Sequence, residues 1–156
     1  TIENALKINL EMPQYISKNI EKSLSQKKLE KSVIVCGLSY KPNVEDMRDS
    51  ASFKIISDLK KKEFKVFGYD PYFKNESVNK YLIENNLNEL NFEKIENLND
   101  GNLRNISCLC IVQHHDIVRE RILEIYEQGK IPLIYDCQHK ISKKFNSKSI
   151  LEFLGE

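Results

Sequence analysis

The sequence lacks an excess of charge of either sign, and it lacks long apolar runs. Its 24 Lys and Arg residues balance 23 Asp and Glu residues, so we expect no general attraction to nucleic acid or to an anionic membrane. The longest apolar runs, such as residues 108–112 and 131–135, have the length of strands and fall far short of the ~20 residues that a membrane-spanning helix needs. We therefore expect neither a membrane span nor a signal peptide.

Cysteine is scarce, and its placement argues against disulfides and metal. Three of the four cysteines lie inside or beside apolar, strand-like runs, which indicates buried free thiols in a reducing cytoplasm. Cys108 and Cys110 form a C-x-C pair that would share one face of a strand. No second pair of ligands follows at zinc-like spacing, so we expect no metal site.

What is present suits one globular, soluble domain. The chain has 156 residues, 40% of them hydrophobic, with seven Phe and seven Tyr for a core, and 30% charged for an exterior. The first residue is Thr1 rather than Met, so we expect a domain excised from a longer protein.

Apolar residues three or four apart predict a long amphipathic helix from residue 2 to about 27. They are Ile2, Leu6, Met12, Ile16, Ile20 and Leu24, with Asn9 on the same stripe. Pro13 removes one main-chain hydrogen bond and crowds the carbonyl of Asn9, so we expect a bend or a break near residues 9–13. Such a helix carries no chemistry, and we expect it to connect domains or to dimerise.

The spacing of apolar residues changes at Ser32, where the globular domain is expected to begin. Residues 33–36 are continuously apolar and end at Gly37, as in a central parallel strand. A helix follows around residues 53–62, with Asp49 or Ser50 as its cap, and then a strand at 64–69 closes the βαβ unit.

The alternation continues to the end of the chain. It predicts a helix at 76–90, a strand at 106–112, a helix at 117–127, a strand at 131–135 and a short final helix at 149–154. This pattern indicates an α/β fold: a Rossmann-like, doubly wound and mostly parallel sheet preceded by a long amino-terminal helix. Ligands of such folds bind at the carboxyl edge of the sheet.

The loop after the first strand, residues 37–52, is the most informative stretch. It lacks G-x-G-x-x-G, so we do not expect the domain to cradle a dinucleotide by itself. Lys41 offers a mobile ammonium and Arg48 a planar fork, both near the amino end of a helix, and Tyr40 offers an aromatic face for a ribose or base. On spacing alone, solvated loop charges and a core tyrosine remain an equal alternative.

Two linked motifs resemble a known family. GLSYKPNVEDMRDSAS at 37–52 and VFGYDPY at 66–72 are similar to the carboxyl-terminal domain of the UDP-glucose/GDP-mannose dehydrogenase family, which opens with G-x-[SA]-[FY]-K-x-x-x-x-D-x-R-x-S and reaches Y-D-P. INLEMP at 8–13 resembles the helix of the branch that acts on UDP-N-acetylhexosamines. The resemblance divides the chain into a connecting or dimerisation helix, residues 1–27, and a UDP-sugar-binding α/β domain, residues 28–156.

The resemblance also implies roles. Tyr40 and Lys41 would contact the UDP-sugar, Lys41 by neutralising phosphate charge, and Arg48 would reach NAD held mainly by another domain. In such enzymes two hydride transfers oxidise C6 of a UDP-hexose, here UDP-N-acetylmannosamine or UDP-N-acetylglucosamine, to the uronate through a covalent cysteine intermediate. The cysteine loop and the NAD domain normally precede the helix with which this chain starts. We therefore assign no catalytic residue, expect the chain alone to be inactive, and expect the full enzyme to be a cytoplasmic homodimer or higher homo-oligomer.

The chain departs from the family after its last predicted strand. Many relatives place an Arg within a few residues of the Asp that corresponds to Asp136, whereas here Gln138, His139 and Lys140 stand in that stretch. An amide or imidazole lacks the constant charge of the guanidinium fork, so ligand affinity or choice is open.

Three further residues invite functional interpretations that we weigh against simpler ones. Adjacent His114 and His115 would point to opposite faces of a strand and so would not share a metal. The resemblance puts His115 at a pocket rim, but a structural role is favoured. For Asp70, which precedes Pro71, capping of the next turn is favoured over binding of a ribose.

Two other functions compete with this one. A non-enzymatic nucleotide-binding or dimerisation module is compatible with the lack of catalytic motifs. A receiver-like signalling domain would need an acidic cluster for magnesium at its strand ends, and the first strand ends in Cys36-Gly37 instead.

Overall fold

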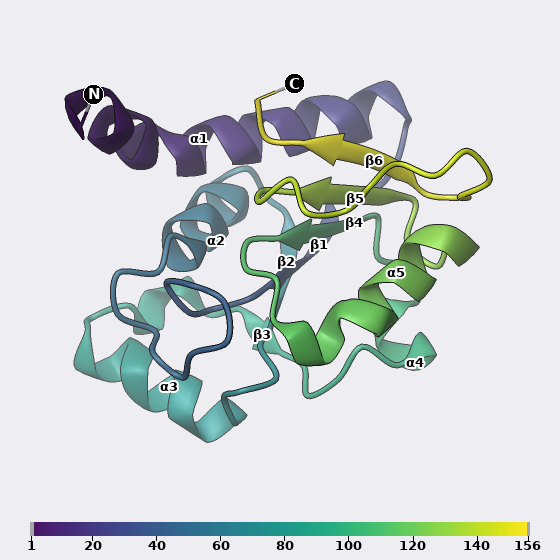
Figure 1. Ribbon diagram of the computed structural model, residues 1–156. Helices are drawn as coiled ribbons and strands as arrows, with labels where there is room; N and C mark the ends of the chain where they lie inside the picture. Colours follow the sequence, from purple (N-terminus) through teal and green to yellow (C-terminus); the bar gives the residue numbers. More distant parts are fainter. Residues whose placement is uncertain (1, 156) are drawn as a thin grey trace.

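The computed structural model describes the backbone of residues 2–155 and the side chains of residues 12–155. One helix, α1 (Ile2–Gln26), opens the chain, and strands then alternate with helices (Figure 1). The strands are β1 (Ser32–Cys36), β2 (Lys65–Tyr69), β3 (Glu93–Lys94), β4 (Cys108–Ile111), β5 (Leu133–Asp136) and β6 (Ile150–Phe153). The other helices are α2 (Ser52–Lys61), α3 (Asn75–Glu84), α4 (Asp100–Leu103) and α5 (Arg119–Gln128), with 3-10 turns at Asn88–Leu90 and Asp116–Val118.

The six strands form one sheet in the order β3-β2-β1-β4-β5-β6, and every neighbouring pair is parallel. All residues of β1, β4 and β5 are buried, as their continuous apolar sequences predict for strands covered on both faces. The strand order reverses direction between β1 and β4. Chains leaving these two strands diverge, and the crevice between them is where ligands bind in such sheets.

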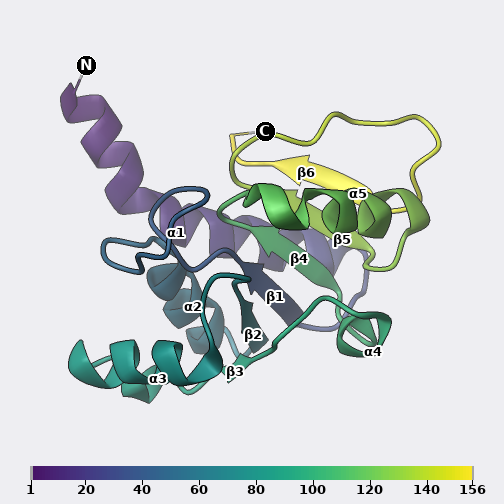
Figure 2. The ribbon, with the colours of Figure 1, turned by 60° about the horizontal axis from the view of Figure 1, so that its bottom comes forward.

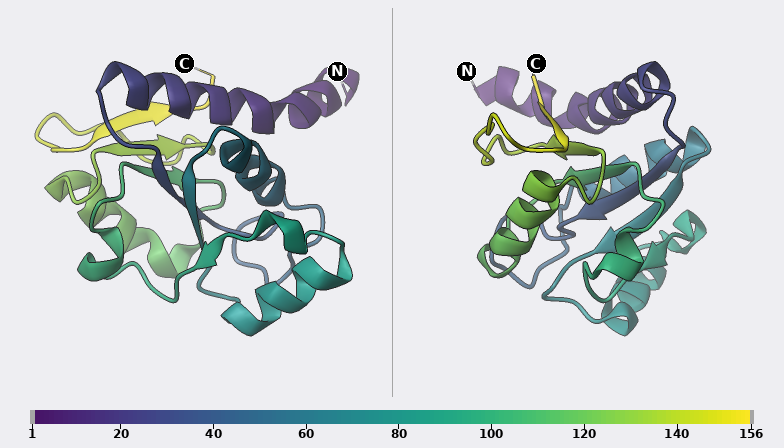
Figure 3. Two further views of the ribbon diagram at one scale, coloured as in Figure 1. Left: turned by 180° about the vertical axis from the view of Figure 1, so that it is seen from behind. Right: turned by 90° about the vertical axis from the view of Figure 1, so that its right-hand side faces the viewer.

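Helices cover both faces of the sheet, which confirms the doubly wound α/β architecture (Figure 3). On one face, α1, α2 and α3 pack against side chains such as Val33, Val35 and Cys110. On the other face, α5 packs against Ile34, Leu109 and Ile134. Cys108 and Cys110 both belong to the first of these cores, as predicted for a C-x-C pair on one strand.

Helix α1 is part of the core. Ile16, Ile20 and Leu24 are 0–1% exposed, and Asn19 donates a hydrogen bond to the hydroxyl of Tyr135, 3.1 Å away. These residues confirm the second half of the predicted apolar stripe, while the side chains of Ile2, Leu6 and Asn9 lie outside the described residues. The helix is unbroken at Pro13, and Figure 2 shows its axis changing direction between its first and second halves, so the bend occurs without a break.

The predicted final helix at 149–154 is wrong: residues Ile150–Phe153 form β6, which pairs in parallel with β5. Ile150 is 46% exposed while Leu151 and Phe153 are 5% exposed, which is the two-residue period of a strand with one covered face. The helix predicted at 76–90 ends earlier, at Glu84. Strand β3 and helix α4 were not predicted, because two and four residues are too few to show a period.

The capping prediction for α2 holds only in part. Ala51 stands at the N-cap and makes no side-chain cap, whereas the hydroxyl of Ser50 accepts a hydrogen bond from the Ser52 amide at 3.2 Å. Asp49 adopts a left-handed backbone with φ of 59° and does not cap the helix. Across the described part of the chain, no helix has the length and apolar character to cross a bilayer.

Candidate functional site

A cavity of about 950 Å³ opens at the carboxyl edge of the sheet. It lies between the bent helix α1, the amino end of α2 and the chain leaving β1, β4 and β5, so it occupies the point where the strand order reverses. Its lining includes Met12, Pro13, Tyr40, Asp49, Ser50, Phe53, Lys54, Tyr81, Gln113, Cys137 and Gln138. Both the place and the size suit a small-molecule ligand.

A second hollow, of about 640 Å³, lies at the opposite edge near the starts of β4 and β5. Its lining includes Lys130, whose ammonium is already 3.1 Å from Asp100. Because parallel sheets bind ligands at their carboxyl ends, the first cavity is the candidate site.

The structure brings Tyr40 and Lys41 together at the mouth of this cavity. Tyr40 lines the cavity and is 43% exposed. The ammonium of Lys41 lies 5.3 Å from the centroid of the Tyr40 ring, a cation–π arrangement. Lys41 is exposed and does not itself line the cavity, so its charge stands above the ring at the rim.

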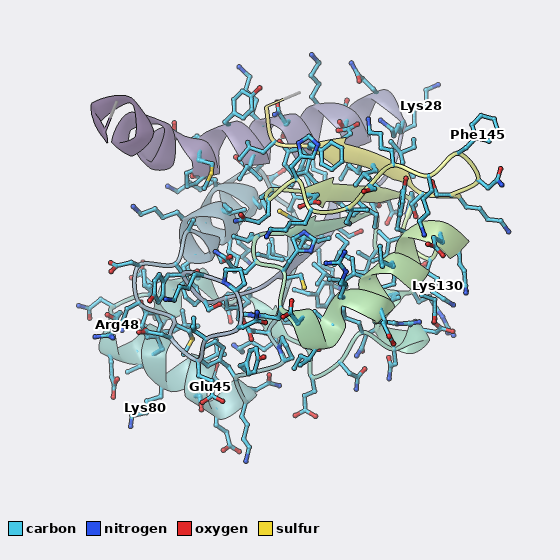
Figure 4. All side chains as sticks on the ribbon, viewed as in Figure 1. Lys28, Glu45, Arg48, Lys80, Lys130 and Phe145 are labelled. Atoms are coloured by element: carbon cyan, nitrogen blue, oxygen red, sulfur yellow. The ribbon has the colours of Figure 1, made fainter. Side chains whose placement is uncertain are left out.

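Arg48 lies apart from that pair. Its side chain is 81% exposed, and Figure 4 shows it at the periphery of the molecule. The guanidinium is bound by Asp46, with Nε 3.0 Å from Oδ1 and Nη2 2.7 Å from Oδ2. Hydrogen bonds from Arg48 lower the pKa of Asp46 to about 2, so the pair is charged at neutral pH.

The loop that carries Tyr40 and Lys41 is tied down by hydrogen bonds. Ser39 Oγ donates to the carbonyl of Lys41 at 2.7 Å, and Gln113 Nε2 donates to the carbonyl of Tyr40 at 2.9 Å. The amide of Asn43 donates to His115 Nδ1 at 2.8 Å. At the root of the loop, the amide of Leu38 donates to Asp70 Oδ2 at 2.7 Å.

His115 is completely buried, which confirms the structural interpretation over a place on the rim. Its Nε2 lies 2.9 Å from Asp70 Oδ2, and its Nδ1 accepts from the Asn43 amide. An accepting Nδ1 carries no proton, so Nε2 carries it and donates to the carboxylate. Asp70 Oδ1 also accepts from the amide of Tyr72 at 2.9 Å, which confirms that Asp70 caps the turn after β2.

His114 and His115 follow β4, which ends at Ile111, so the predicted alternation on a strand does not apply, but the two rings still have different partners. The Nε2 of His114 lies 2.7 Å from Oδ1 of Asp136, whose side chain is fully buried. Burial alone would raise the pKa of Asp136, but hydrogen bonds from His114 and from the amides of Ile141 and Gln138 outweigh it and lower the pKa. Asp136 is therefore a carboxylate that orders the loop after β5.

Among the three residues in place of the family's arginine, only Gln138 lines the cavity. Its Nε2 donates to the carbonyl of Val112 at 2.9 Å. His139 is instead stacked on Phe153, with ring centroids 3.8 Å apart. The polar side chain that residues 138–140 contribute to the cavity lining is thus a neutral amide.

The cysteines are free thiols, as predicted, and three of the four are buried. Cys137 reaches the cavity lining, and its Sγ lies 3.9 Å from that of Cys110. The hydrogen bond with Cys110 and burial raise the pKa of Cys137, which disfavours a nucleophilic thiolate. Within residues 12–155, no group of three or more His, Cys, Asp or Glu is arranged to hold a metal ion.

Sequence reasoning missed Lys54 and Gln113. Lys54 lies in the first turn of α2 and is a cation that lines the cavity wall. Its neighbours Phe53 and Ile55 are buried, so the helical pattern marked Lys54 only as facing away from the core. Gln113 is the second residue after β4, a position that the rule on strand ends could have singled out.

Comparison with known proteins gives one consistent family. Residues 34–143 match the UDP binding domain of the UDP-glucose/GDP-mannose dehydrogenase family. A UDP-N-acetyl-D-mannosamine dehydrogenase of Methanococcus vannielii is 31% identical over 99% of this chain and 34% of its own length. Nearly all of this chain matches these curated relatives, but it spans only about a third of their length.

Solved structures share the fold. The UDP-N-acetyl-mannosamine dehydrogenase of Staphylococcus aureus superposes with a TM-score of 0.67 at 20% identity, over 94% of this chain and 31% of that one. The GDP-mannose dehydrogenase of Pseudomonas aeruginosa superposes with a TM-score of 0.69 at 16% identity, over 95% of this chain and 32% of that one. At these identities the likeness concerns the fold of the chain alone.

Proposed function

Because the chain belongs to the UDP-glucose/GDP-mannose dehydrogenase family and matches its UDP binding domain, we propose that it is the nucleotide-sugar-binding part of an NAD-dependent UDP-sugar 6-dehydrogenase. The full enzyme would oxidise C6 of a UDP-hexose to the uronate, in a cytoplasmic pathway of polysaccharide biosynthesis. Of the two candidate substrates we propose UDP-N-acetylmannosamine before UDP-N-acetylglucosamine, because the relatives found among curated proteins are UDP-N-acetyl-D-mannosamine dehydrogenases.

The observation that carries this proposal is the cavity between β1 and β4. Lys41 at its rim and Lys54 on its wall supply positive charge for a diphosphate. Ala51 leaves the amino end of α2 without a side-chain cap, and helix amino ends favour anions. The ring of Tyr40 at the mouth supplies a face for the uridine.

The residues of this chain do not fit a role as the main binding site for NAD. The loop after β1 holds one glycine, Gly37, and a Cβ there would lie 2.7 Å from the amide nitrogen of Gln113, so the main chain has no open turn for a dinucleotide pyrophosphate. The exposed fork of Arg48 is proposed to reach NAD bound by another domain. The residues described above bind and orient the UDP-sugar, and we assign them no part in hydride transfer, so the chain alone is proposed to be inactive.

Titration with UDP tests the proposal. We expect the chain to release heat on binding UDP in calorimetry and Lys41→Ala to bind about tenfold more weakly, the equivalent of ~1.4 kcal/mol. Lys80→Ala is the matched control, because that lysine is 77% exposed on α3 and lies outside the cavity lining. No heat with UDP, or equal affinity in Lys41→Ala, would count against the assigned pocket.

We also propose that α1 joins this domain to the rest of the enzyme and that the full enzyme is a homodimer or higher homo-oligomer. The alternative, a non-enzymatic module that dimerises through α1, makes a separate prediction. It requires the 156-residue chain to sediment as a dimer, and a purely monomeric chain would exclude it.

A further inference from the structure

We infer that Gln113 and His115, at the carboxyl end of β4, clamp the Tyr40–Asn43 loop and thereby position Tyr40 and Lys41 for the nucleotide. The inference rests on the proposed function for its ligand, but the clamp itself is a feature of the described contacts. Both residues hold the loop main chain, so they are positioning residues and not catalytic ones, although Gln113 also lines the cavity.

The clamp grips the loop on both sides of Lys41. Before it, Gln113 Nε2 donates to the carbonyl of Tyr40 at 2.9 Å. After it, the amide of Asn43 donates to His115 Nδ1 at 2.8 Å. Between these two bonds lie only Lys41 and Pro42, whose ring fixes its own φ angle and restricts the residue before it. The lysine main chain therefore has few conformations left.

Each half of the clamp is itself anchored. The main chain of Gln113 packs against Gly37, where any Cβ would lie 2.7 Å from its nitrogen and 2.8 Å from its oxygen. The imidazole of His115 is held by Asp70 Oδ2, 2.9 Å from Nε2, and by the edge of the Tyr72 ring, with centroids 4.8 Å apart. Asp70 in turn accepts from the Leu38 amide, so the ends of β1, β2 and β4 form one connected support.

One feature of the Gln113 side chain suits a role in the site better than a role in the stability of the fold. Its side chain is buried, with 6% exposure, and among the described residues its Oε1 has no hydrogen-bond partner. A buried acceptor without a partner costs free energy that an apolar side chain of the same shape would avoid. The contribution of the amide is its bond to the carbonyl of Tyr40, the residue that lines the cavity.

Gln113→Met separates these roles, because methionine has nearly the same length and neither donor nor acceptor. We expect thermal stability to change little, because the loss of the bond to the Tyr40 carbonyl and the removal of an acceptor without a protein partner oppose each other. Hydrogen exchange of a peptide covering residues 38–47 should become faster, and the UDP affinity should fall about three- to tenfold. Gln128→Met, at the exposed end of α5, is the control and should change none of the three.

A matched pair of variants tests the other half of the clamp. In His115→Asn the amide oxygen can stand where Nδ1 stands and keep the bond from Asn43, whereas in His115→Gln the amide nitrogen can stand near Nε2 and keep the bond to Asp70. We expect His115→Gln to speed exchange in residues 38–47 more than His115→Asn does, and to bind UDP more weakly. The reverse order would overturn this half of the clamp.

The outcomes distinguish the clamp from the proposed function. Unchanged exchange in Gln113→Met, or faster exchange with unchanged UDP affinity, would overturn the clamp as a positioning device. A loss of thermal stability in that variant would show a structural role instead. If the unmodified chain fails to bind UDP, the proposed function fails, while the exchange measurement still decides whether the two residues hold the loop.

Discussion

His114 Nε2 lies 2.7 Å from Oδ1 of Asp136, and this contact completes a set of four donors around a carboxylate with no exposed surface. The other three donors are the amides of Gln138, at 2.9 Å, Lys140, at 2.7 Å, and Ile141, at 2.8 Å. One side chain thus fixes the loop that leaves β5 and brings Gln138 to the cavity.

The first prediction concerns the stability of the fold at acid pH. The pKa of Asp136 is lowered in the folded chain, so its carboxylate stabilises the fold fully above the ordinary Asp pKa of ~3.9 and loses this contribution as the pH falls through the lower folded value. We expect Asp136→Asn to lower the free energy of unfolding by about 2–4 kcal/mol at neutral pH. The NH2 group of the asparagine would face hydrogen-bond donors where the carboxylate now accepts from them. Urea unfolding at a series of pH values should show this difference shrinking below about pH 4. A difference that stays constant down to about pH 3 would contradict the assignment.

The second prediction concerns Gly37, whose φ of 94° is in the left-handed region. A Cβ there would lie 2.7 Å from the nitrogen of Gln113, which is main chain and cannot move aside cheaply. We expect Gly37→Ala to cost about 2–4 kcal/mol, from overpacking and from the backbone conformation together. Gly101→Ala is the control: its new Cβ would meet nothing closer than 3.5 Å inside helix α4, so stability should stay equal or rise by up to about 1 kcal/mol. Thermal unfolding of the two variants checks both.

Sequence alone was enough for the centre of the fold. Continuous apolar runs marked β1, β4 and β5 because strands covered on both faces need them, and the motif in residues 37–52 marked the loop that reaches the cavity. Strand β6 was mistaken for a helix because its four residues are covered on one face only, a pattern too short to distinguish the two periods.

The parts of the site that escaped prediction depend on tertiary contacts. Gln113 and His115 meet the loop across 72 or 73 residues of sequence, and no local pattern encodes such a bond. Lys54 faces the cavity because Met12 and Pro13 of α1 line the same cavity as this part of α2, a tertiary arrangement. Arg48 was singled out by its motif, and in the structure it pairs with Asp46, two residues away in the same loop.

The third prediction concerns thiol reactivity. Burial raises the pKa of Cys36 and of Cys108, and the hydrogen bond with Cys110 together with burial raises that of Cys137. The reactive species is the thiolate, so the folded chain should react slowly with a disulfide reagent at about pH 8, with the partly exposed Cys137 first. Under denaturing conditions all four thiols should react at once. Rapid reaction of two or more thiols in the native state would show that this core is open.

The last prediction concerns Lys54, which stands on the first turn of α2 and makes no ion pair among the described residues. Its exposed ammonium, next to a helix end without a side-chain cap, should contact the diphosphate in the cavity. We expect Lys54→Gln to weaken UDP binding about three- to tenfold, or up to ~1.4 kcal/mol, and to reduce the dependence of the affinity on salt.

The control for Lys54 is Lys80→Gln, which removes the same charge from the outer face of α3 (Figure 4). Since both variants change the net charge equally, a loss that is confined to Lys54→Gln reports the cavity wall and not long-range attraction. Comparing UDP with uridine sharpens the result further. A cation that acts on the diphosphate should leave uridine binding unchanged, whereas equal losses for both ligands would place Lys54 beside the base and would require the nucleotide to lie the other way round in the cavity.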